Sequence, residues 1–349
     1  MLIDVETFTV RKRFPLTISR GTTSETTNMW IRIQQGGVEG WGEASPFSII
    51  REGRQSTEIL FEALTEVATL LEIYSPWERQ QIEWALAEAE VPSAVCAAID
   101  LALYDWLGKQ VGKPLWRMWG LNRRRIVPTS VTIGINTVEG AKQRVRDWIP
   151  LTGGDVLKIK LGSSEGIDAD REMLLAIRSE APHAELSVDA NGGWSVDDAV
   201  TMCDWLESQG VRHVEQPLAA GEEENLPLLY KRSRIPIFVD ESCFTSRDIP
   251  QLADRVHGIN IKLMKSGGLT EAMRMVHTAK ACGLQVMFGC YSDSTLANTA
   301  AAQLSPLADY LDLDSHLNLL DDPFTGATLQ NGRLIPNDLP GLGVKYNAS

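Results

Sequence analysis

Three acidic residues stand at corresponding places in three successive segments of the chain. Asp189, Glu215 and Asp240 each end a short apolar run, and a helical segment separates each from the next. Parallel strands joined by helices all end at one face, so the three carboxylates are expected to converge. Carboxylate oxygens are the ligands that Mg²⁺ prefers. One such residue would more simply cap the following helix, but three in succession favour a divalent metal site.

Lysines occur at the same level of the apolar runs. Lys158 and Lys160 share one strand face in LKIK because side chains alternate with a period of two, and Lys262 ends a later run. A neighbouring ammonium group and a nearby metal ion lower the pKa of a lysine, which makes it a usable base near neutral pH. The alternative is a solvated network of lysine–carboxylate pairs, and the shared face of Lys158 and Lys160 argues against it.

Eight short apolar runs follow residue 125, and helical patterns separate them. This alternation predicts parallel strands with helical crossovers, and eight similar units favour an α/β fold of the closed (β/α)₈ TIM-barrel type. A doubly wound sheet is the alternative, but no glycine-rich dinucleotide motif follows an early run. The expected strands are 127–134, 156–161, 185–190, 211–217, 235–241, 258–263, 284–289 and 310–314.

The chain on either side of these runs has a different pattern. Residues 1–50 indicate a strand meander with a turn at Gly36-Gly37, and the polar stretch from Thr17 to Asn28 is expected to be a mobile loop. Helical spacing follows from about residue 56 to residue 107. We therefore expect an α+β capping domain over 1–122 and a barrel over 123–320. A tail, 321–349, would return to the capping domain with a last strand at GRLIP.

Composition excludes several classes of protein. The chain has 349 residues, 44% of them hydrophobic, which is enough for a large core and too apolar for a disordered chain. Its net charge of −13 would repel nucleic acid. No run is long enough to span a membrane and no signal peptide opens the sequence, so we expect a cytoplasmic protein with a small-molecule partner. The five cysteines are scattered and indicate neither disulfides nor a zinc ribbon.

Five motifs along the chain match one known family in order. LKIKLG, SVDANGGWS, VEQP, VDES and NIKLMKSGG closely resemble the enolase superfamily, in its muconate-lactonizing subgroup. The GWGEA of residues 40–44 and the segment 94–115 resemble that family's capping domain and its junction with the barrel. The resemblance covers nearly the whole chain, and it implies a capped barrel enzyme.

The resemblance also implies a role for the charged residues at the strand ends. Lys160 and Lys262 would be acid/base catalysts on opposite sides of the substrate, and Lys158 would support Lys160 and help neutralise the substrate carboxylate. Asn191 and Glu241 would support the metal ligands. Those ligands to Mg²⁺ would be Asp189, Glu215 and Asp240.

Three further positions bear on the substrate. Asp312 and Asp314, in LDLDS, resemble the pair with which dipeptide epimerases hold the substrate's α-ammonium group. Two acceptor-only carboxylates suit an ammonium with three donors; the alternative is that they only shape the barrel rim. Arg20 stands about where Ala-Glu epimerases carry an arginine for the glutamate side chain, the alternative being a solvated loop residue. Asp293 replaces the glutamate of many relatives, and its shorter side chain alters any contact with the substrate or Lys262.

These features predict a Mg²⁺-dependent epimerase that inverts the α-carbon of the C-terminal residue of an L,L-dipeptide such as L-Ala-L-Glu. One lysine would remove the α-proton to give an enediolate, and the other would return a proton to the opposite face. The resemblance further implies a role in cell-wall peptide metabolism and a possible homo-oligomer.

Two rival functions remain at this point. Muconate cycloisomerisation or o-succinylbenzoate synthesis would use the same site, but those substrates carry no ammonium group for Asp312 and Asp314. The second rival is a noncatalytic, metal-dependent ligand-binding protein that has kept the site. Loss of turnover without loss of ligand affinity, on replacing Lys160 or Lys262, would separate the enzyme from the binding protein.

Overall fold

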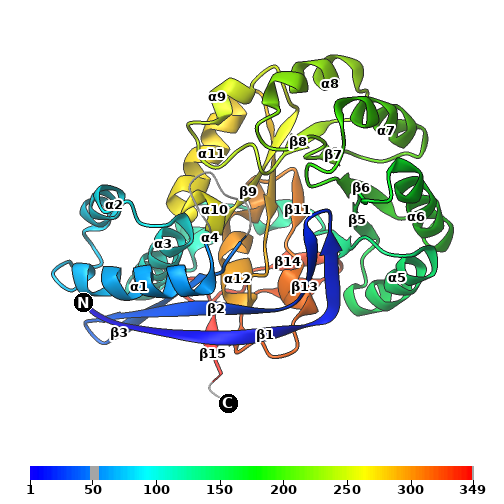
Figure 1. Ribbon diagram of the computed structural model, residues 1–349. Helices are drawn as coiled ribbons and strands as arrows, with labels where there is room; N and C mark the ends of the chain where they lie inside the picture. Colours follow the sequence, from blue (N-terminus) through cyan, green and yellow to red (C-terminus); the bar gives the residue numbers. More distant parts are fainter. Residues whose placement is uncertain (48–54, 348–349) are drawn as a thin grey trace.

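A capping domain lies beside a parallel barrel in the computed structural model, which describes residues 1–47 and 55–347 (Figure 1). The last residues of the expected meander, 48–50, and of the tail, 348–349, lie outside the described residues. The predicted fold class, a (β/α)₈ barrel with an α+β cap, is confirmed.

Three antiparallel strands and three helices form the cap. The strands are β1 (Leu2–Ile18), β2 (Gly21–Gln35) and β3 (Val38–Ala44), and the helices are α1 (Thr57–Leu71), α2 (Arg79–Glu88) and α3 (Ser93–Gln110). Gly36 and Gly37 join β2 to β3 with φ angles of +63° and +76°, which glycine adopts without strain. Helix α3 lies so close to β3 that a Cβ atom on Gly42 would be 1.8 Å from the carbonyl oxygen of Ala98.

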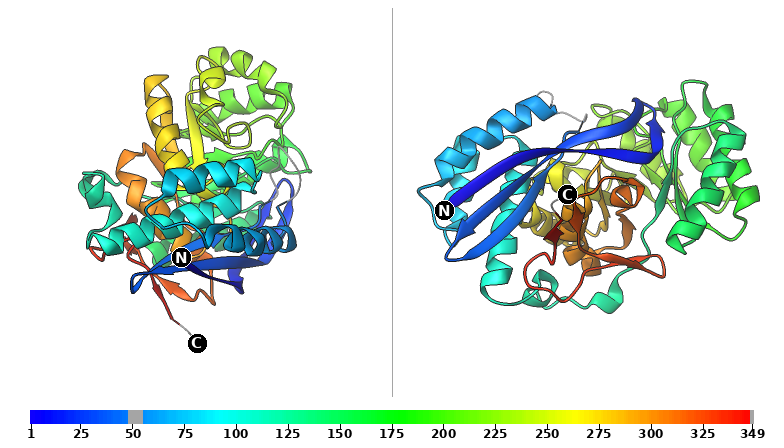
Figure 2. Two further views of the ribbon diagram at one scale, coloured as in Figure 1. Left: turned by 90° about the vertical axis from the view of Figure 1, so that its left-hand side faces the viewer. Right: turned by 90° about the horizontal axis from the view of Figure 1, so that it is seen from below.

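The stretch from Thr17 to Asn28 is not the mobile loop that we expected. It belongs to a long hairpin arm in which β1 and β2 pair up to Ile18 and Gly21, so that Ser19 and Arg20 alone form the turn. Threonines are β-branched and favour strands, and the hydroxyls of Thr17 and Thr22 bond across the arm at 2.9 Å. The arm reaches the barrel beside β5 and β6 (Figures 1 and 2), where the carbonyl of Thr17 accepts a hydrogen bond from Ile135 N at 2.8 Å.

Eight parallel strands form the barrel in sequence order, and the bridge between Thr129 and Leu311 closes the ring. All eight expected strands are present, and each is shorter than the apolar run that predicted it. The strands are β4 (Val131–Ile133), β5 (Val156–Lys160), β6 (Glu185–Asp189), β7 (Val214–Glu215), β8 (Ile237–Val239), β9 (Gly258–Lys262), β10 (Gln285–Gly289) and β11 (Tyr310–Asp312).

Helices cover the outside of the barrel between successive strands (Figure 1). Their inward faces are apolar and join the core that runs through barrel and cap. They are α5 (Val138–Thr152), α6 (Ile167–Glu180), α7 (Val196–Ser208), α8 (Leu226–Arg232), α9 (Ile249–Leu252), α10 (Leu263–Ser266), α11 (Leu269–Ala281) and α12 (Thr295–Leu304); α4 (Leu115–Met118) links cap to barrel.

The tail crosses back to the cap and contacts its aromatic side chains. β12 (Phe324–Thr325) pairs with β15 (Lys345–Tyr346), and the rings of Tyr346 and Trp41 stack with centroids 5.1 Å apart. The strand expected at GRLIP is β14 (Arg333–Ile335). It pairs with β13 (Thr328–Gln330) and not with the sheet of the cap.

Two further observations concern the described residues as a whole. None of their helices combines the length and the apolar character that crossing a bilayer requires. None of the five cysteines, all of which the structure describes, forms a disulfide; Cys203 and Cys243 are buried, and the other three are half-buried.

Candidate active site

The carboxyl ends of the barrel strands bring the predicted lysines and acids into one buried cluster. Lys160, the last residue of β5, places its Nζ atom 2.6 Å from Oδ2 of Asp189, the last residue of β6. Lys158 lies deeper on the same strand face, with its Nζ atom 3.2 Å from Asp189 Oδ2, 2.6 Å from Glu215 Oε2 and 2.6 Å from Asp312 Oδ2. The period of two in LKIK therefore has the consequence expected from the sequence: both lysines point into the barrel.

Asp240 follows β8 and is held from two sides by lysines. Lys262, at the end of β9, donates to its Oδ2 atom at 2.8 Å, and Lys265 donates to its Oδ1 atom and its carbonyl oxygen, both at 2.6 Å. Lys265 is a contact that the sequence interpretation missed, although its spacing of one helical turn from Lys262 was visible in NIKLMK.

Asn260 is a second missed residue. It lies two positions before Lys262 on β9, and its Nδ2 atom donates to Oε1 of Glu215 at 2.8 Å. The period of two could have found it, since Asn260 and Lys262 must share one face of the strand.

Lys160 and Lys262 stand across the barrel from each other. Their strands, β5 and β9, are separated by β6, β7 and β8, which carry or precede the three acids Asp189, Glu215 and Asp240. In a ring of eight strands this is a diametric arrangement. A substrate above the acids would therefore meet one ammonium group on each side.

Neighbouring carboxylates raise the pKa values of Lys158 and Lys262, whereas the sequence led us to expect lowered values. Burial lowers the pKa of Lys158, but Asp312, Glu215 and Asp189 raise it more, and the result lies well above its ordinary value. Lys262 behaves in the same way, with Asp240 as its main partner. Each ammonium group sits against a carboxylate, and that attraction outweighs burial. The lowering expected from a bound metal ion stays a prediction.

Glu215 has the opposite environment. Burial, and then the charge of Asp189, raise its pKa to about 7, although Lys158 opposes the shift. Its Oε2 atom has the ammonium of Lys158 as a neighbour but no hydrogen bond of normal geometry among the described residues. Additional positive charge at this point would therefore be favourable.

Asn191 and Glu241 connect the cluster to the hairpin arm. Asn191 donates from Nδ2 to Glu241 Oε1 at 3.1 Å, and its backbone N–H donates to Asp189 Oδ1 at 2.8 Å. Arg20, at the arm's turn, places Nη1 2.8 Å from the same Glu241 oxygen and 2.9 Å from the carbonyl of Asn191. Arg20 is thus part of the site, but its guanidinium is paired with an acid of the protein.

Asp312 and Asp314 lie on the opposite side of the cluster, at β11. Asp312 ends the strand and bonds to Lys158 and to Ser130 Oγ at 2.8 Å. Asp314 lies beyond the strand end, where it accepts from the backbone N–H of Thr132 at 2.6 Å. Burial, and then Asp312, raise the pKa of Asp314 to about 6.

Asp293 follows β10 and faces the cap. Its carboxylate bonds to Ser45 of the cap and accepts from Tyr291 N at 3.2 Å, while the Nζ atom of Lys262 lies 4.3 Å from the centre of the Tyr291 ring. Asp293 therefore links the cap to the neighbourhood of Lys262.

A cavity of about 500 Å³ opens beside the hairpin arm, and Asn191 and Glu241, which connect the arm to the cluster, lie in its wall. Its walls come from the arm and from the loops after β5, β6 and β7. Residues that line it include Ser19, Arg20, Gly162, Asn191, Gln216 and Glu241.

Comparison with known families covers both domains. Residues 2–120 match the N-terminal domain of the mandelate racemase/muconate lactonizing enzymes, and residues 140–349 match the enolase C-terminal domain-like family. The chain belongs to the enolase superfamily. The resemblance inferred from the motifs is thereby confirmed.

Similar members of the enolase superfamily share the full length of the chain. A protein of Roseobacter litoralis named hydrophobic dipeptide epimerase is 44% identical over 348 residues, 98% of each chain. A protein of Bacteroides thetaiotaomicron named L-Ala-D/L-Glu epimerase is 34% identical over 97% of this chain and 86% of its own. The solved dipeptide epimerase of Cytophaga hutchinsonii, complexed with Mg and D-Ala-L-Val, has a TM-score of 0.92 at 28% identity and covers 99% of this chain and 95% of its own.

The three carboxylates of Asp189, Glu215 and Asp240 are of the chemical type that binds a divalent cation. Among the described residues, no three acidic, histidine or cysteine side chains are grouped closely enough to hold a metal ion, and each of the three acids is paired with a lysine. The donor set is nevertheless three buried carboxylates from successive strands, the hard oxygen ligands of Mg²⁺. The ammonium of Lys158 already lies between two of them, within 3.2 Å of Asp189 and Glu215.

Proposed function

We propose that the protein is a Mg²⁺-dependent dipeptide epimerase that inverts the α-carbon of the C-terminal residue by a two-lysine 1,1-proton transfer. The observation that carries the proposal is the diametric arrangement of Lys160 and Lys262, on β5 and β9, with three buried carboxylates between them. Inversion of a carbon acid needs a base on one face and an acid on the other. Related chains named dipeptide epimerases support the substrate class.

The proton transfer uses two lysines of the cluster, Lys160 and Lys262. Either Lys160 or Lys262 takes the α-proton, the substrate becomes an enediolate, and the other lysine returns a proton to the opposite face. Lys158, held by Glu215, Asp189 and Asp312, stays charged and stabilises the negative charge that develops on the substrate carboxylate.

The metal ion has one role in this proposal. Bound by Asp189, Glu215 and Asp240, Mg²⁺ supplies positive charge that makes the α-proton more acidic. Asn191 and Glu241 keep the acids oriented through the hydrogen bonds described above.

The substrate's α-ammonium group is assigned to Asp312 and Asp314. Asp312 shares one of its oxygens with Lys158, and each carboxylate retains lone pairs for a further donor. A free amino terminus on the substrate separates this reaction from muconate cycloisomerisation and o-succinylbenzoate synthesis.

We propose that the inverted residue carries an apolar side chain. Nη1 of Arg20 is already paired with the buried Glu241 and with the carbonyl of Asn191, so the charge of the guanidinium is offset by an acid of the protein and attracts a substrate carboxylate less strongly. Asp293 is likewise bonded to Ser45. Relatives at 44% identity are named hydrophobic dipeptide epimerases, which agrees with this choice.

L-Ala-L-Glu epimerisation is the second candidate. It is favoured by the position of Arg20 at the lip of the cavity, with about a third of its side chain exposed (34%). The variant Arg20→Met separates the two. If Arg20 acts through Glu241, the rates with L-Ala-L-Leu and L-Ala-L-Glu should fall by similar factors; a loss confined to L-Ala-L-Glu would favour the second candidate.

The experiment that tests the function is isotope exchange in ²H₂O. With Mg²⁺ present, L-Ala-L-Leu and L-Ala-L-Glu are each incubated with the enzyme, and deuterium at the C-terminal α-carbon is followed by mass spectrometry. We expect epimerisation with deuterium uptake, at a kcat/KM at least about tenfold higher for L-Ala-L-Leu. Absence of exchange with a wide set of L,L-dipeptides would reject the proposal, and ligand binding without exchange would favour the noncatalytic binding protein.

A further inference from the structure

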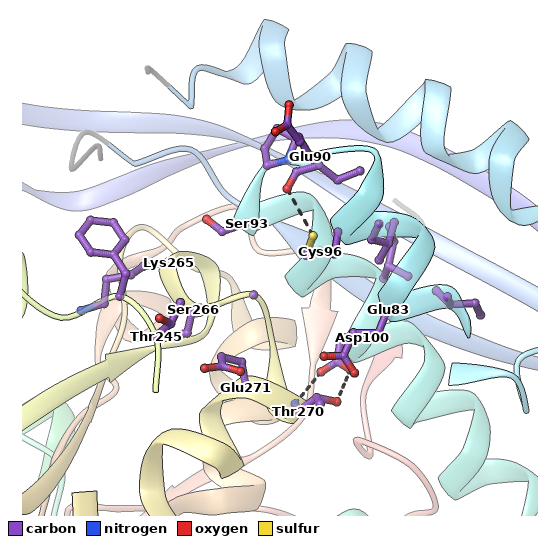
Figure 3. A pocket seen from close by; sticks show the side chains of 18 of the residues that line it. Glu83, Glu90, Ser93, Cys96, Asp100, Thr245, Lys265, Ser266, Thr270 and Glu271 are labelled. Carbon is purple, nitrogen blue, oxygen red and sulfur yellow. Dashed lines mark hydrogen bonds between the residues drawn. The ribbon is translucent and has the colours of Figure 1, made fainter. Parts of the chain in front are cut away.

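A second cavity, of about 660 Å³, lies between the cap and the barrel (Figure 3), and it shares no lining residue with the cavity beside the hairpin arm. Helices α2 and α3 form one wall, and α10 with the start of α11 forms the other. Lys265 contributes its alkyl stem, while its ammonium group turns away to Asp240. The proposed reaction makes no use of this cavity.

The size and lining of this interdomain cavity suit a small organic molecule. Its volume falls within the range of ligand pockets, and much of its wall is apolar. The apolar side chains are Ile59, Ile82, Leu86, Ile99, Leu103 and Phe244.

Two hydrogen-bond donors face the cavity without an acceptor. The hydroxyl of Ser266 belongs to a residue that is 6% exposed, and it has no hydrogen-bond partner among the residues that the structure describes. Nη1 of Arg79 likewise has no hydrogen-bond partner among these residues, and the guanidinium of Arg79 lies over the ring of Tyr104, 4.1 Å from its centre. Leaving buried donors unpaired is costly, so an acceptor such as a carboxylate is expected to meet them.

One acid of the cavity also retains capacity for a ligand. Asp100 accepts from the backbone N–H of Thr270 at 2.9 Å and from its hydroxyl at 2.6 Å, which leaves each carboxylate oxygen a further lone pair. The acids Glu83 and Glu271, by contrast, are occupied by Arg274. Within the described residues, Asp100 has no ion-pair partner within 4 Å. Two other charged residues of the lining, Glu90 and Arg247, are exposed, so the half-buried part of the wall offers Arg79 as a cation and Asp100 as an anion.

We propose that the interdomain cavity binds an α-amino acid with an apolar side chain. The carboxylate would accept from Arg79 and Ser266, the ammonium group would donate to Asp100, and the side chain would lie among the apolar residues. The proposal does not depend on the epimerase activity. It would, however, connect the two sites, because Ser266 and Lys265 belong to α10, which directly follows Lys262.

The test is titration calorimetry with L-leucine as the probe. Two matched probes remove one charged group each: 4-methylpentanoate lacks the ammonium group, and 3-methylbutylamine lacks the carboxylate. We expect saturable binding of one L-leucine per chain, weakened at least about tenfold for either matched probe. Absence of saturable L-leucine binding, or equal affinity for all three probes, would overturn the proposal.

Variants show which cavity takes the probe. Ala87 lines the interdomain cavity, so Ala87→Trp should fill it and abolish binding, whereas Ala89→Trp, at the end of the same helix and outside the lining, should not. Arg79→Gln, which fills nothing, should weaken L-leucine binding at least about tenfold while keeping the melting temperature near that of the parent. If Asp312→Ala abolishes binding and Ala87→Trp does not, L-leucine occupies the barrel site and the proposal is wrong.

Discussion

The lysines of the site differ in how many carboxylate partners each has. Lys158 is held by three carboxylates, two of them at 2.6 Å, whereas Lys160 has one carboxylate partner, Asp189 at 2.6 Å, among the described residues. Lys262 likewise pairs with Asp240 alone and otherwise faces the ring of Tyr291. Three carboxylates hold Lys158 in place, which suits charge stabilisation, whereas Lys160 and Lys262 stand on opposite sides of the barrel, which suits proton transfer.

This division predicts an asymmetric result for lysine variants. Lys160→Ala and Lys262→Ala should each lower epimerisation by at least about a thousandfold, since a base or an acid is missing on one face. Each variant should still exchange the α-proton of one epimer with ²H₂O, and the two variants should act on opposite epimers. NMR of the α-proton for L,L- and L,D-dipeptides measures this. The two-lysine mechanism would fail if both variants kept exchange on the same epimer.

A buried glutamate joins strand β3 of the cap to helix α12 of the barrel. Glu43, on β3, accepts hydrogen bonds from Ser294 N at 2.9 Å, Ser294 Oγ at 2.5 Å and Ala297 N at 3.0 Å, and it thereby caps the N-terminus of α12 in the barrel. Asn28 of β2 donates to it at 2.8 Å. A strand of the cap thus satisfies the free N–H groups of a barrel helix.

The contact between Glu43 and the N-terminus of α12 predicts that the stability of the protein depends on pH. Burial, and then the charge of Asp293, raise the pKa of Glu43 to about 8. The folded protein therefore binds a proton that the unfolded chain releases near its ordinary pKa of 4.5, so the contribution is complete below that value and is lost as the pH rises towards 8.

Glu43→Gln should remove this contribution, because an amide does not titrate. The melting temperature of the parent minus that of the variant should fall steadily between pH 5 and pH 8. Differential scanning calorimetry at several pH values measures it, with the exposed Glu39→Gln on the same strand as the control. A difference that stays constant over this range would contradict the assignment of Glu43.

The sequence predicted best those helices and strands whose apolar residues follow a regular pattern. The barrel strands are apolar runs of regular spacing, and charged residues at their ends converge because parallel strands share a direction. The hairpin arm was missed because Ser, Thr and Gly also favour loops, although its cross-strand partners, such as Thr17 and Thr22, lie close together in the sequence. The spacing of Lys265 from Lys262 was visible in the sequence, but its partner Asp240 was not, and the pairing of Arg20 with Glu241 joins residues 221 positions apart.

The whole molecule combines a large net negative charge with buried acids. Its charge of −13 means that any added salt reduces repulsion between surface charges, while Asp189, Glu215 and Asp240 are 0% exposed. A cation that binds only the folded chain stabilises it by about 2.7 kcal/mol at a hundred times its dissociation constant. Specific Mg²⁺ binding must therefore be separated from general screening.

We expect Mg²⁺ to raise the melting temperature by more than NaCl at equal ionic strength, and EDTA to reverse the rise and remove epimerase activity. Asp240→Asn should abolish the difference between the two salts, since it removes one carboxylate ligand while keeping the size of the side chain. Asp204→Asn, a change at an exposed position of α7, removes the same charge and should leave the difference intact. Equal responses to the two salts in the parent chain would mean that these acids do not hold the metal, and so would an unchanged difference in Asp240→Asn. The comparison with Asp204→Asn is decisive because surface screening depends on net charge and not on which aspartate is lost.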